Sequence, residues 1–162
     1  MYFTSYDSLV GKLLLTCTDQ ALTGLYMTRE IPEEEDHPIF RQTKKWLDAY
    51  FRGAPPEPDI PLAMEGTPFQ QQVWKLLLEI PYGEVRTYGD LAREMAHITG
   101  KETMSAQAVG QAVGRNPIGI LIPCHRVVGA GGKLTGYVWG LDKKAWLLQH
   151  EGWKGTDRHD HK

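Results

Sequence analysis

The 162-residue sequence contains only two cysteines and no long apolar run. Cys17 and Cys124 lie far apart, and neither belongs to a CxxC motif or a cysteine–histidine cluster. A disulfide framework and a structural metal site are therefore unsupported. No segment approaches the roughly 20 apolar residues of a membrane span, and the N-terminus lacks the basic and apolar regions of a secretory signal. We expect a cytoplasmic protein that makes no use of a membrane.

The chain also has little net charge, −2 at neutral pH. That charge is unevenly distributed along the sequence. Residues 1–66 carry 6 basic and 11 acidic side chains, whereas residues 67–153 carry 9 basic and 7 acidic ones. A weakly basic second half permits a nucleic-acid partner but predicts only modest affinity for it.

The length suits one compact domain or two small ones. Short apolar segments separated by turn residues predict three strands, at 2–6, 12–18 and 21–27, and apolar residues at helical spacing predict a helix over 38–51. The proline-rich residues 54–66 predict an extended linker. We therefore expect a sheet-and-helix domain over 1–60, a second domain over 67–153 and a disordered tail over 154–162.

The second domain has clear helix start signals. Thr67 precedes Pro68, and Thr87 precedes Tyr88, so each threonine is predicted to cap a helix. A further helix over 105–114 consists almost entirely of small residues. Two helices joined by a loop resemble a helix-turn-helix. The small residues allow two interpretations at this point, a close approach to a DNA groove or a tightly packed core helix.

Pro123-Cys124-His125-Arg126 follows the apolar residues 118–122, which predict a buried strand. A neighbouring base can convert a thiol into the reactive thiolate at neutral pH. The alternative is a core cysteine that packs as a small apolar side chain. The pair alone does not decide between a nucleophile and a core residue.

Six segments favour the first interpretation when taken together in order. They are GTPFQQQVW, IPYGEVRTYGDLA, AVGRNP, ILIPCHRVVG, LTGYVWGLDKKAWLL and QHEG. Over residues 67–152 this combination resembles the O6-alkylguanine-DNA alkyltransferase family. The resemblance implies an α+β fold, with a small N-terminal β-sheet and helix domain and a mostly helical, winged-helix-like DNA-binding domain.

The resemblance also implies a function. The family repairs double-stranded DNA by irreversible, stoichiometric transfer of an alkyl group, such as methyl, from O6-alkylguanine to the motif cysteine, here Cys124. O4-methylthymine is implied as a second substrate. S-alkylcysteine is a thioether without an acyl carbon for water to attack, so the protein is expected to act once. No cofactor and no metal are expected, and the protein should act as a monomer.

Specific roles follow from the resemblance. His125 would take the thiol proton through a water, Glu151 would stabilise the imidazolium, and Asn116 would support this network. Tyr88 would hydrogen-bond the guanine. Considered singly, Glu151 is a solvated charge at a helix end, Asn116 a turn residue and Tyr88 a half-buried helix residue; their order within one family pattern favours function.

The target atom is stacked inside a duplex, so the nucleotide must be extruded into a pocket. The family pattern places five residues around that pocket, Val127, Tyr137, Val138, Trp139 and Lys144. Five more would face DNA, mainly its minor groove and phosphates: Thr87, Ala106, Gln107, Gly110 and Arg115.

Three features depart from the family pattern. Gln107 stands where an arginine usually enters the duplex, which puts the efficiency of base flipping in question. The loop 96–104 is longer than in many relatives. Trp139 replaces a small residue, and we expect it either to narrow the pocket against a benzyl group or to stack on that group.

Three other functions account for the sequence less completely. An alkyltransferase-like protein that binds lesions without repairing them would lack the motif cysteine, and Cys124 is present. A winged-helix regulator without chemistry does not explain Cys124, His125, Asn116 and Glu151 together. A cysteine hydrolase would need an oxyanion site, for which the sequence has no signature.

Overall fold

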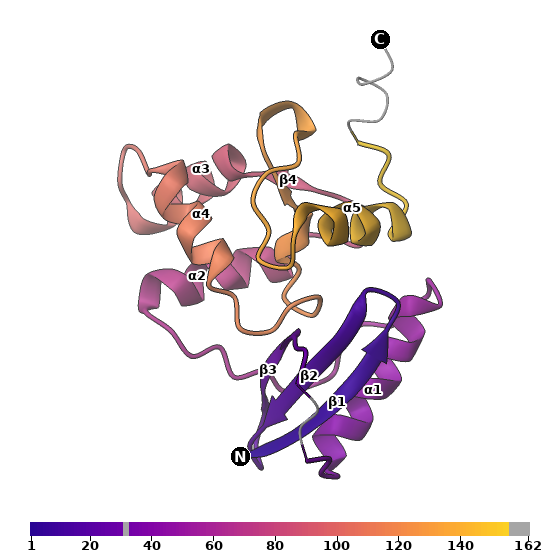
Figure 1. Ribbon diagram of the computed structural model, residues 1–162. Helices are drawn as coiled ribbons and strands as arrows, with labels where there is room; N and C mark the ends of the chain where they lie inside the picture. Colours follow the sequence, from indigo (N-terminus) through magenta and orange to yellow (C-terminus); the bar gives the residue numbers. More distant parts are fainter. Residues whose placement is uncertain (31–32, 156–162) are drawn as a thin grey trace. The chain divides into compact units, whose positions relative to one another are not determined.

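A computed structural model describes residues 1–30 and 33–155 (Figure 1). The chain divides into two compact units. The first contains Met1–Glu65 together with Pro117–Leu121, and the second contains Gly66–Asn116 and the residues from Ile122 onward. Most of the predicted disordered tail, residues 156–162, lies outside the described residues.

The first unit is built on an antiparallel sheet in the order β1 (Tyr2–Ser8), β2 (Gly11–Cys17) and β3 (Leu22–Met27). Helix α1 (Pro38–Phe51) packs on this sheet, as Figure 1 shows. The core consists of alternate strand residues and one face of the helix, among them Leu13, Leu15, Leu25, Phe40, Leu47 and Tyr50. The predicted strands and helix are therefore present, within a residue or two at their ends.

Two further segments join this unit through β3. Leu22 bridges to Leu62, so part of the predicted linker pairs with the sheet edge. Leu25 bridges in the same way to Ile118, with the Leu25 amide donating to Pro117 O at 3.0 Å. The two short bridges extend the edge of the sheet with chain from distant parts of the sequence.

The predicted strand over residues 118–122 is wrong. Only Ile118 makes a strand-like bridge, and the chain then turns sharply, with Ile120 at φ 66° and the Leu121 amide donating to Gly119 O at 2.7 Å. All five residues are nevertheless buried. An apolar run reports burial, and burial alone does not distinguish a strand from a buried turn.

The second unit is mostly helical. No helix among the residues that the structure describes is long and apolar enough to cross a membrane. Short strands β4 and β5 pair in parallel, Arg86 with Val127 and Thr87 with Val128. The elements follow in the order α2 (Pro68–Leu78), β4 (Arg86–Thr87), α3 (Tyr88–Thr99), α4 (Ala106–Gly114), the 3-10 turn η1 (Cys124–Arg126), β5 (Val127–Val128), the 3-10 turn η2 (Ala130–Gly132) and α5 (Leu141–His150).

Capping and small side chains explain how these helices begin and pack. Thr67 and Thr87 cap α2 and α3 as predicted, each accepting a hydrogen bond from the third helical amide. Each also completes a capping box with the side chain of the third helical residue. On α4, Val109 and Ala112 are buried, and Trp74 of α2 donates its indole N–H to Ala112 O at 2.8 Å. One face of α4 is therefore a packed core face, whereas its first turn is exposed.

Candidate active site

Cys124 opens the 3-10 turn η1, and this turn separates the directions of three consecutive side chains. A 3-10 turn has about three residues per turn, so neighbouring side chains point about 120° apart. Cys124 lines a pocket, while His125 and Arg126 both reach the carboxylate of Glu151. One short turn thus presents a thiol on one side and an ionic network on the other.

The pocket has a volume of about 260 Å³. Glycines on α4 and in the loop before α5 leave space beside the thiol, and the lining combines apolar groups with hydroxyl and amide groups, as small-molecule pockets usually do. Cys124 is 6% exposed. The lining residues are Tyr88, Gly110, Val113, Gly114, Asn116, Cys124, Gly136, Tyr137 and Val138.

The Cys124 thiol is protonated at rest. Burial raises its pKa, while a hydrogen bond from Asn116 and the positive charge of Lys144 act in the opposite direction without overcoming burial. A thiol in this state needs a base before it can act as a nucleophile. The two groups that lower its pKa would also stabilise the thiolate once it forms.

Asn116 also fixes the chain that leads to the thiol. Its side-chain amide donates to Ile122 O at 2.7 Å, two residues before Cys124. The Cys124 amide donates to the same carbonyl oxygen at 2.7 Å. Asn116 therefore contacts both the reactive residue and the turn that presents it.

His125 and Glu151 form a buried pair. Nε2 of His125 lies 2.6 Å from Oε2 of Glu151, and both side chains are fully buried. Burial lowers the pKa of His125, although the hydrogen bond and charge of Glu151 act against it, so the ring is neutral at pH 7. Nε2 then donates to the carboxylate, which leaves Nδ1 with a free lone pair. Nδ1 is buried and accepts from no group in the described part of the chain.

Glu151 is ionised despite its burial. Burial by itself raises the pKa of this carboxyl, but hydrogen bonds and charge from His125 and Arg126 outweigh it and lower the pKa to about 2. Arg126 donates through Nε to Oε1 at 2.7 Å and through Nη2 to Oε2 at 3.1 Å. Sequence reasoning missed Arg126, although it stands next to His125 in the motif that carries the thiol.

Tyr88 and Lys144 meet beside the pocket. Tyr88 is the first residue of α3, and burial raises the pKa of its hydroxyl, which therefore remains a donor. Lys144 is fully buried; it donates to Thr135 O at 2.7 Å and Gly136 O at 3.2 Å and lies 5.9 Å from the Tyr88 ring centre. Burial lowers the pKa of Lys144 to about 8. Lys144 thus holds the loop that forms one pocket wall.

The structure separates the five predicted pocket residues into two sets. Tyr137 and Val138 line the cavity, Val138 being 71% exposed at its rim. Val127, Trp139 and Lys144 are not among its lining residues. The Trp139 ring instead packs 5.7 Å from the Tyr137 ring. An effect of Trp139 on the size of the substrate would have to act through Tyr137.

The predicted DNA-facing residues lie on α3 and α4. Thr87 is the N-cap of α3, and Gly110 faces the pocket from the middle of α4. The others are exposed, Ala106 and Gln107 in the first turn of α4 and Arg115 at its C-cap. The exposed first turn of α4 therefore carries one small side chain, Ala106, and one longer polar side chain, Gln107.

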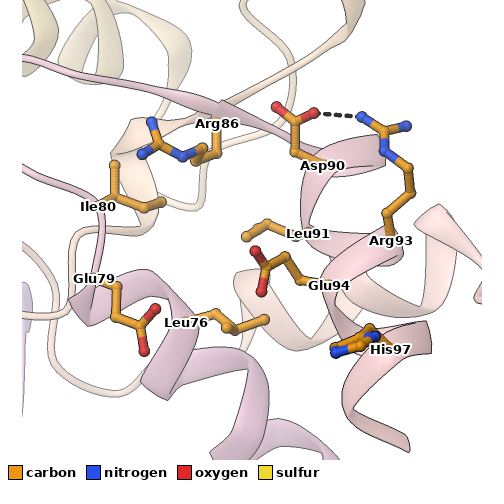
Figure 2. A pocket seen from close by; sticks show the side chains of 9 residues that line it. All are labelled: Leu76, Glu79, Ile80, Arg86, Asp90, Leu91, Arg93, Glu94 and His97. Carbon is orange, nitrogen blue, oxygen red and sulfur yellow. Dashed lines mark hydrogen bonds and ion pairs between the residues drawn. The ribbon is translucent and has the colours of Figure 1, made fainter. Parts of the chain in front are cut away.

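A larger cavity of about 610 Å³ lies between α2 and α3 and is shown in Figure 2. Its floor is apolar, formed by Leu76, Ile80 and Leu91, and its rim is charged, with Asp90 and Arg93 forming an ion pair. It contains no cysteine. No group of three side chains able to hold a metal occurs in the described ranges. Of these two pockets, the smaller one is lined by a cysteine.

Comparison with known proteins gives a class consistent with this geometry. The DNA-binding domain of 6-O-methylguanine DNA methyltransferase matches residues 68–153, and the ribonuclease-like domain of the same proteins matches residues 1–64. The chain belongs to the 6-O-methylguanine DNA methyltransferase family.

Individual relatives cover nearly the whole chain. The methylated-DNA–protein-cysteine methyltransferase of Methanosarcina acetivorans is 43% identical over 94% of this chain and 99% of its own length. That of Methanosarcina barkeri is 46% identical over 93% of this chain and 97% of its own. The crystal structure of Mycobacterium tuberculosis OGT in complex with DNA matches with a TM-score of 0.82 and 43% identity, covering 93% of this chain and 92% of that one.

Proposed function

We propose that this protein repairs DNA by moving an alkyl group, methyl in the simplest case, from O6 of guanine to Cys124. The observation that carries the proposal is the arrangement around the turn η1. A protonated thiol faces a pocket, and the next residue is a neutral, buried histidine held by an ionised glutamate. Membership of the family, with relatives named methylated-DNA–protein-cysteine methyltransferase, supports the same reaction.

The reaction begins with proton transfer. Nδ1 of His125 accepts the Cys124 proton through a water, and Glu151 stabilises the imidazolium that forms. The thiolate then attacks the alkyl carbon, a C–S bond forms, and the C–O6 bond breaks with its electron pair going to the purine. The Tyr88 hydroxyl, kept protonated by burial, donates a hydrogen bond that helps to neutralise the leaving purine.

The product explains single use. S-alkylcysteine is a thioether, and it offers water no acyl carbon to attack. Acid–base groups such as His125 and Glu151 cannot reverse the transfer, because an unactivated thioether is a poor alkyl donor. Each protein molecule is therefore consumed by one lesion.

The substrate we propose is double-stranded DNA that carries O6-alkylguanine, with O4-methylthymine as a second substrate. The pocket encloses the thiol, so a stacked base cannot reach it and must be extruded. The exposed first turn of α4, with Ala106 and Gln107, supports an approach to the minor groove, and Arg115 supports a phosphate contact. We propose that the protein acts as a monomer in the cytoplasm.

Replacing each cysteine in turn tests the proposal. Cys124→Ala should abolish methyl transfer from an O6-methylguanine duplex and retain binding to that duplex, because the predicted DNA contacts lie elsewhere. Cys17→Ala is the matched control: Cys17 is buried in β2 of the other unit, and its replacement should leave transfer per folded molecule unchanged. Transfer that survives in Cys124→Ala would overturn the proposal.

A further inference from the structure

Arg126 is a nearly buried cation with no role in the reaction described so far. It is 8% exposed and lies in the same 3-10 turn as Cys124 and His125. A cation in such a position is costly unless it is paired and hydrogen-bonded. Its contacts therefore indicate what it does.

The guanidinium is held on three sides. Two of its nitrogens grip both oxygens of Glu151, at 2.7 and 3.1 Å, and Nη1 donates to Ile80 O at 2.7 Å. Its central carbon lies 5.7 Å from the Tyr82 ring centre. A bidentate contact fixes the plane of a carboxylate as well as its position. The Glu151 oxygen that meets Nε2 of His125 is therefore aimed by Arg126.

The same contacts set the charge that His125 experiences. Glu151 favours the imidazolium, whereas the positive charges of Arg126 and Lys144 oppose it. Among the described residues, Cys124, Tyr82 and Tyr137 also interact electrostatically with these groups, and burial is the largest cause of the raised pKa of each. At neutral pH the Arg126–Glu151 pair is electrically balanced, so His125 can remain neutral and able to accept a proton.

We propose that Arg126 is a positioning residue for alkyl transfer, which holds the Glu151 carboxylate toward His125 and offsets its charge so that His125 stays an unprotonated base. This inference rests on the proposed function, because it acts through the His125 base. Two properties of the Arg126 side chain are involved, its bidentate geometry and its positive charge.

Two substitutions separate those properties. Arg126→Lys keeps the charge but loses the bidentate contact with Glu151, so the rate of methyl transfer should fall about ten-fold at every pH. Arg126→Met removes the charge, so His125 should bind a proton more readily and the acid limb of the rate profile should move to higher pH. Single-turnover methyl transfer from an O6-methylguanine duplex, followed across pH, measures both; the amplitude reports the folded fraction and the rate constant reports the chemistry.

A double-mutant cycle tests whether Arg126 acts through Glu151. Glu151→Gln alone should slow transfer by about ten-fold. Adding Arg126→Met to Glu151→Gln should cause no further slowing. The double variant also lacks both buried charges. Its comparison with Glu151→Gln therefore remains informative if Arg126→Met alone does not fold. Arg41→Met, which breaks an exposed pair with Asp36 in the other unit, is the control and should leave rate and pH profile unchanged.

The outcomes are distinct. A shifted acid limb in Arg126→Met, an unshifted one in Arg126→Lys and no added loss in the double variant support the inference. The inference would be overturned if Arg126→Met kept the acid limb of the wild-type rate profile and only reduced the amplitude. It would also be overturned if Arg126→Met slowed transfer by the same factor in the wild-type protein and in Glu151→Gln. If the wild-type protein itself transfers no methyl to Cys124, the proposed function fails instead.

Discussion

At the scale of single residues, reactivity depends on which buried group holds a proton. Cys124 and His125 are both in their uncharged forms, because burial raises the pKa of the thiol and lowers that of the imidazole. Glu151 is the exception, and two donors keep it ionised. In the proposed reaction, one proton transfer from Cys124 to His125 therefore creates both the nucleophile and the imidazolium.

The buried network also predicts how stability depends on pH. The pKa of Glu151 is about 2 in the folded protein, below its ordinary value of 4.5, and that of His125 lies below 6.5. Both groups bind protons more readily when unfolded. Their contributions are complete above their ordinary values, and they are lost as pH falls from about 6.5 toward 2.

Urea unfolding at a series of pH values checks this dependence. We expect the free energy of unfolding to decrease steadily over that range, and the slope below pH 4.5 to be smaller in Glu151→Gln. Glu94→Gln, which replaces an exposed carboxylate on α3, should keep the wild-type slope. An unchanged slope in Glu151→Gln would show that this carboxyl does not titrate as the structure indicates.

At the scale of elements, α4 reconciles the two interpretations that its small residues allowed. Val109 and Ala112 pack into the core, whereas Ala106 and Gln107 are exposed and Gly110 faces the thiol pocket. Glycine in a helix interior lowers helix stability relative to alanine. At position 110 glycine leaves open the part of the pocket that lies beside Tyr88.

Gly110→Ala should therefore trade function for stability. A Cβ at this position would lie 3.6 Å from the Tyr88 ring, an ordinary contact, so the helix should gain about 0.5–1 kcal/mol. The added methyl also intrudes on the pocket, so transfer should slow with both duplex substrate and free O6-methylguanine. Thermal unfolding and single-turnover rates measure the two effects.

Gly89→Ala on α3 is the comparison, because its Cβ would lie 3.5 Å from the flexible end of Arg93 and 3.7 Å from the Thr87 hydroxyl oxygen, both ordinary contacts. It should not slow the reaction with the free base. A rate for Gly110→Ala equal to that of the wild type would mean that the substrate does not use this part of the pocket.

The sequence predicted elements wherever the signal was local. Thr67 and Thr87 cap the helices they were expected to cap, because a side chain and a nearby amide suffice for a cap. The strand at 118–122 failed because its residues are buried through a turn at Ile120. The contact of Arg126 with Glu151 could not be predicted for a related reason. The two residues are distant in sequence, and only the fold brings their charges together.

At the scale of the whole molecule, the exposed side chains of residues 67–153 offer DNA only a small excess of positive charge. Residues 67–153 carry 9 basic and 7 acidic side chains, but Arg126 and Lys144 are buried, as is Glu151. Seven basic and six acidic side chains remain for the surface. If the base is extruded as we propose, we expect shape and the contacts of that base to contribute much of the binding.

This charge balance predicts a shallow salt dependence. The logarithm of the DNA association constant should fall with the logarithm of salt concentration much less steeply than for a protein with about ten phosphate contacts. Arg115→Gln should reduce the slope by about one if Arg115 meets a phosphate, whereas Arg41→Gln should leave it unchanged. A steep slope in fluorescence-anisotropy titrations would contradict the prediction.

In the proposed function, Cys124 takes one alkyl group and is not regenerated. Intact-protein mass, followed by peptide mapping, tests it after incubation with excess O6-methylguanine duplex. We expect a final gain of one methyl per protein, located on Cys124, and an amount of repaired guanine equal to the amount of protein. Repaired guanine in excess of protein, or a methyl located on Cys17, would contradict it.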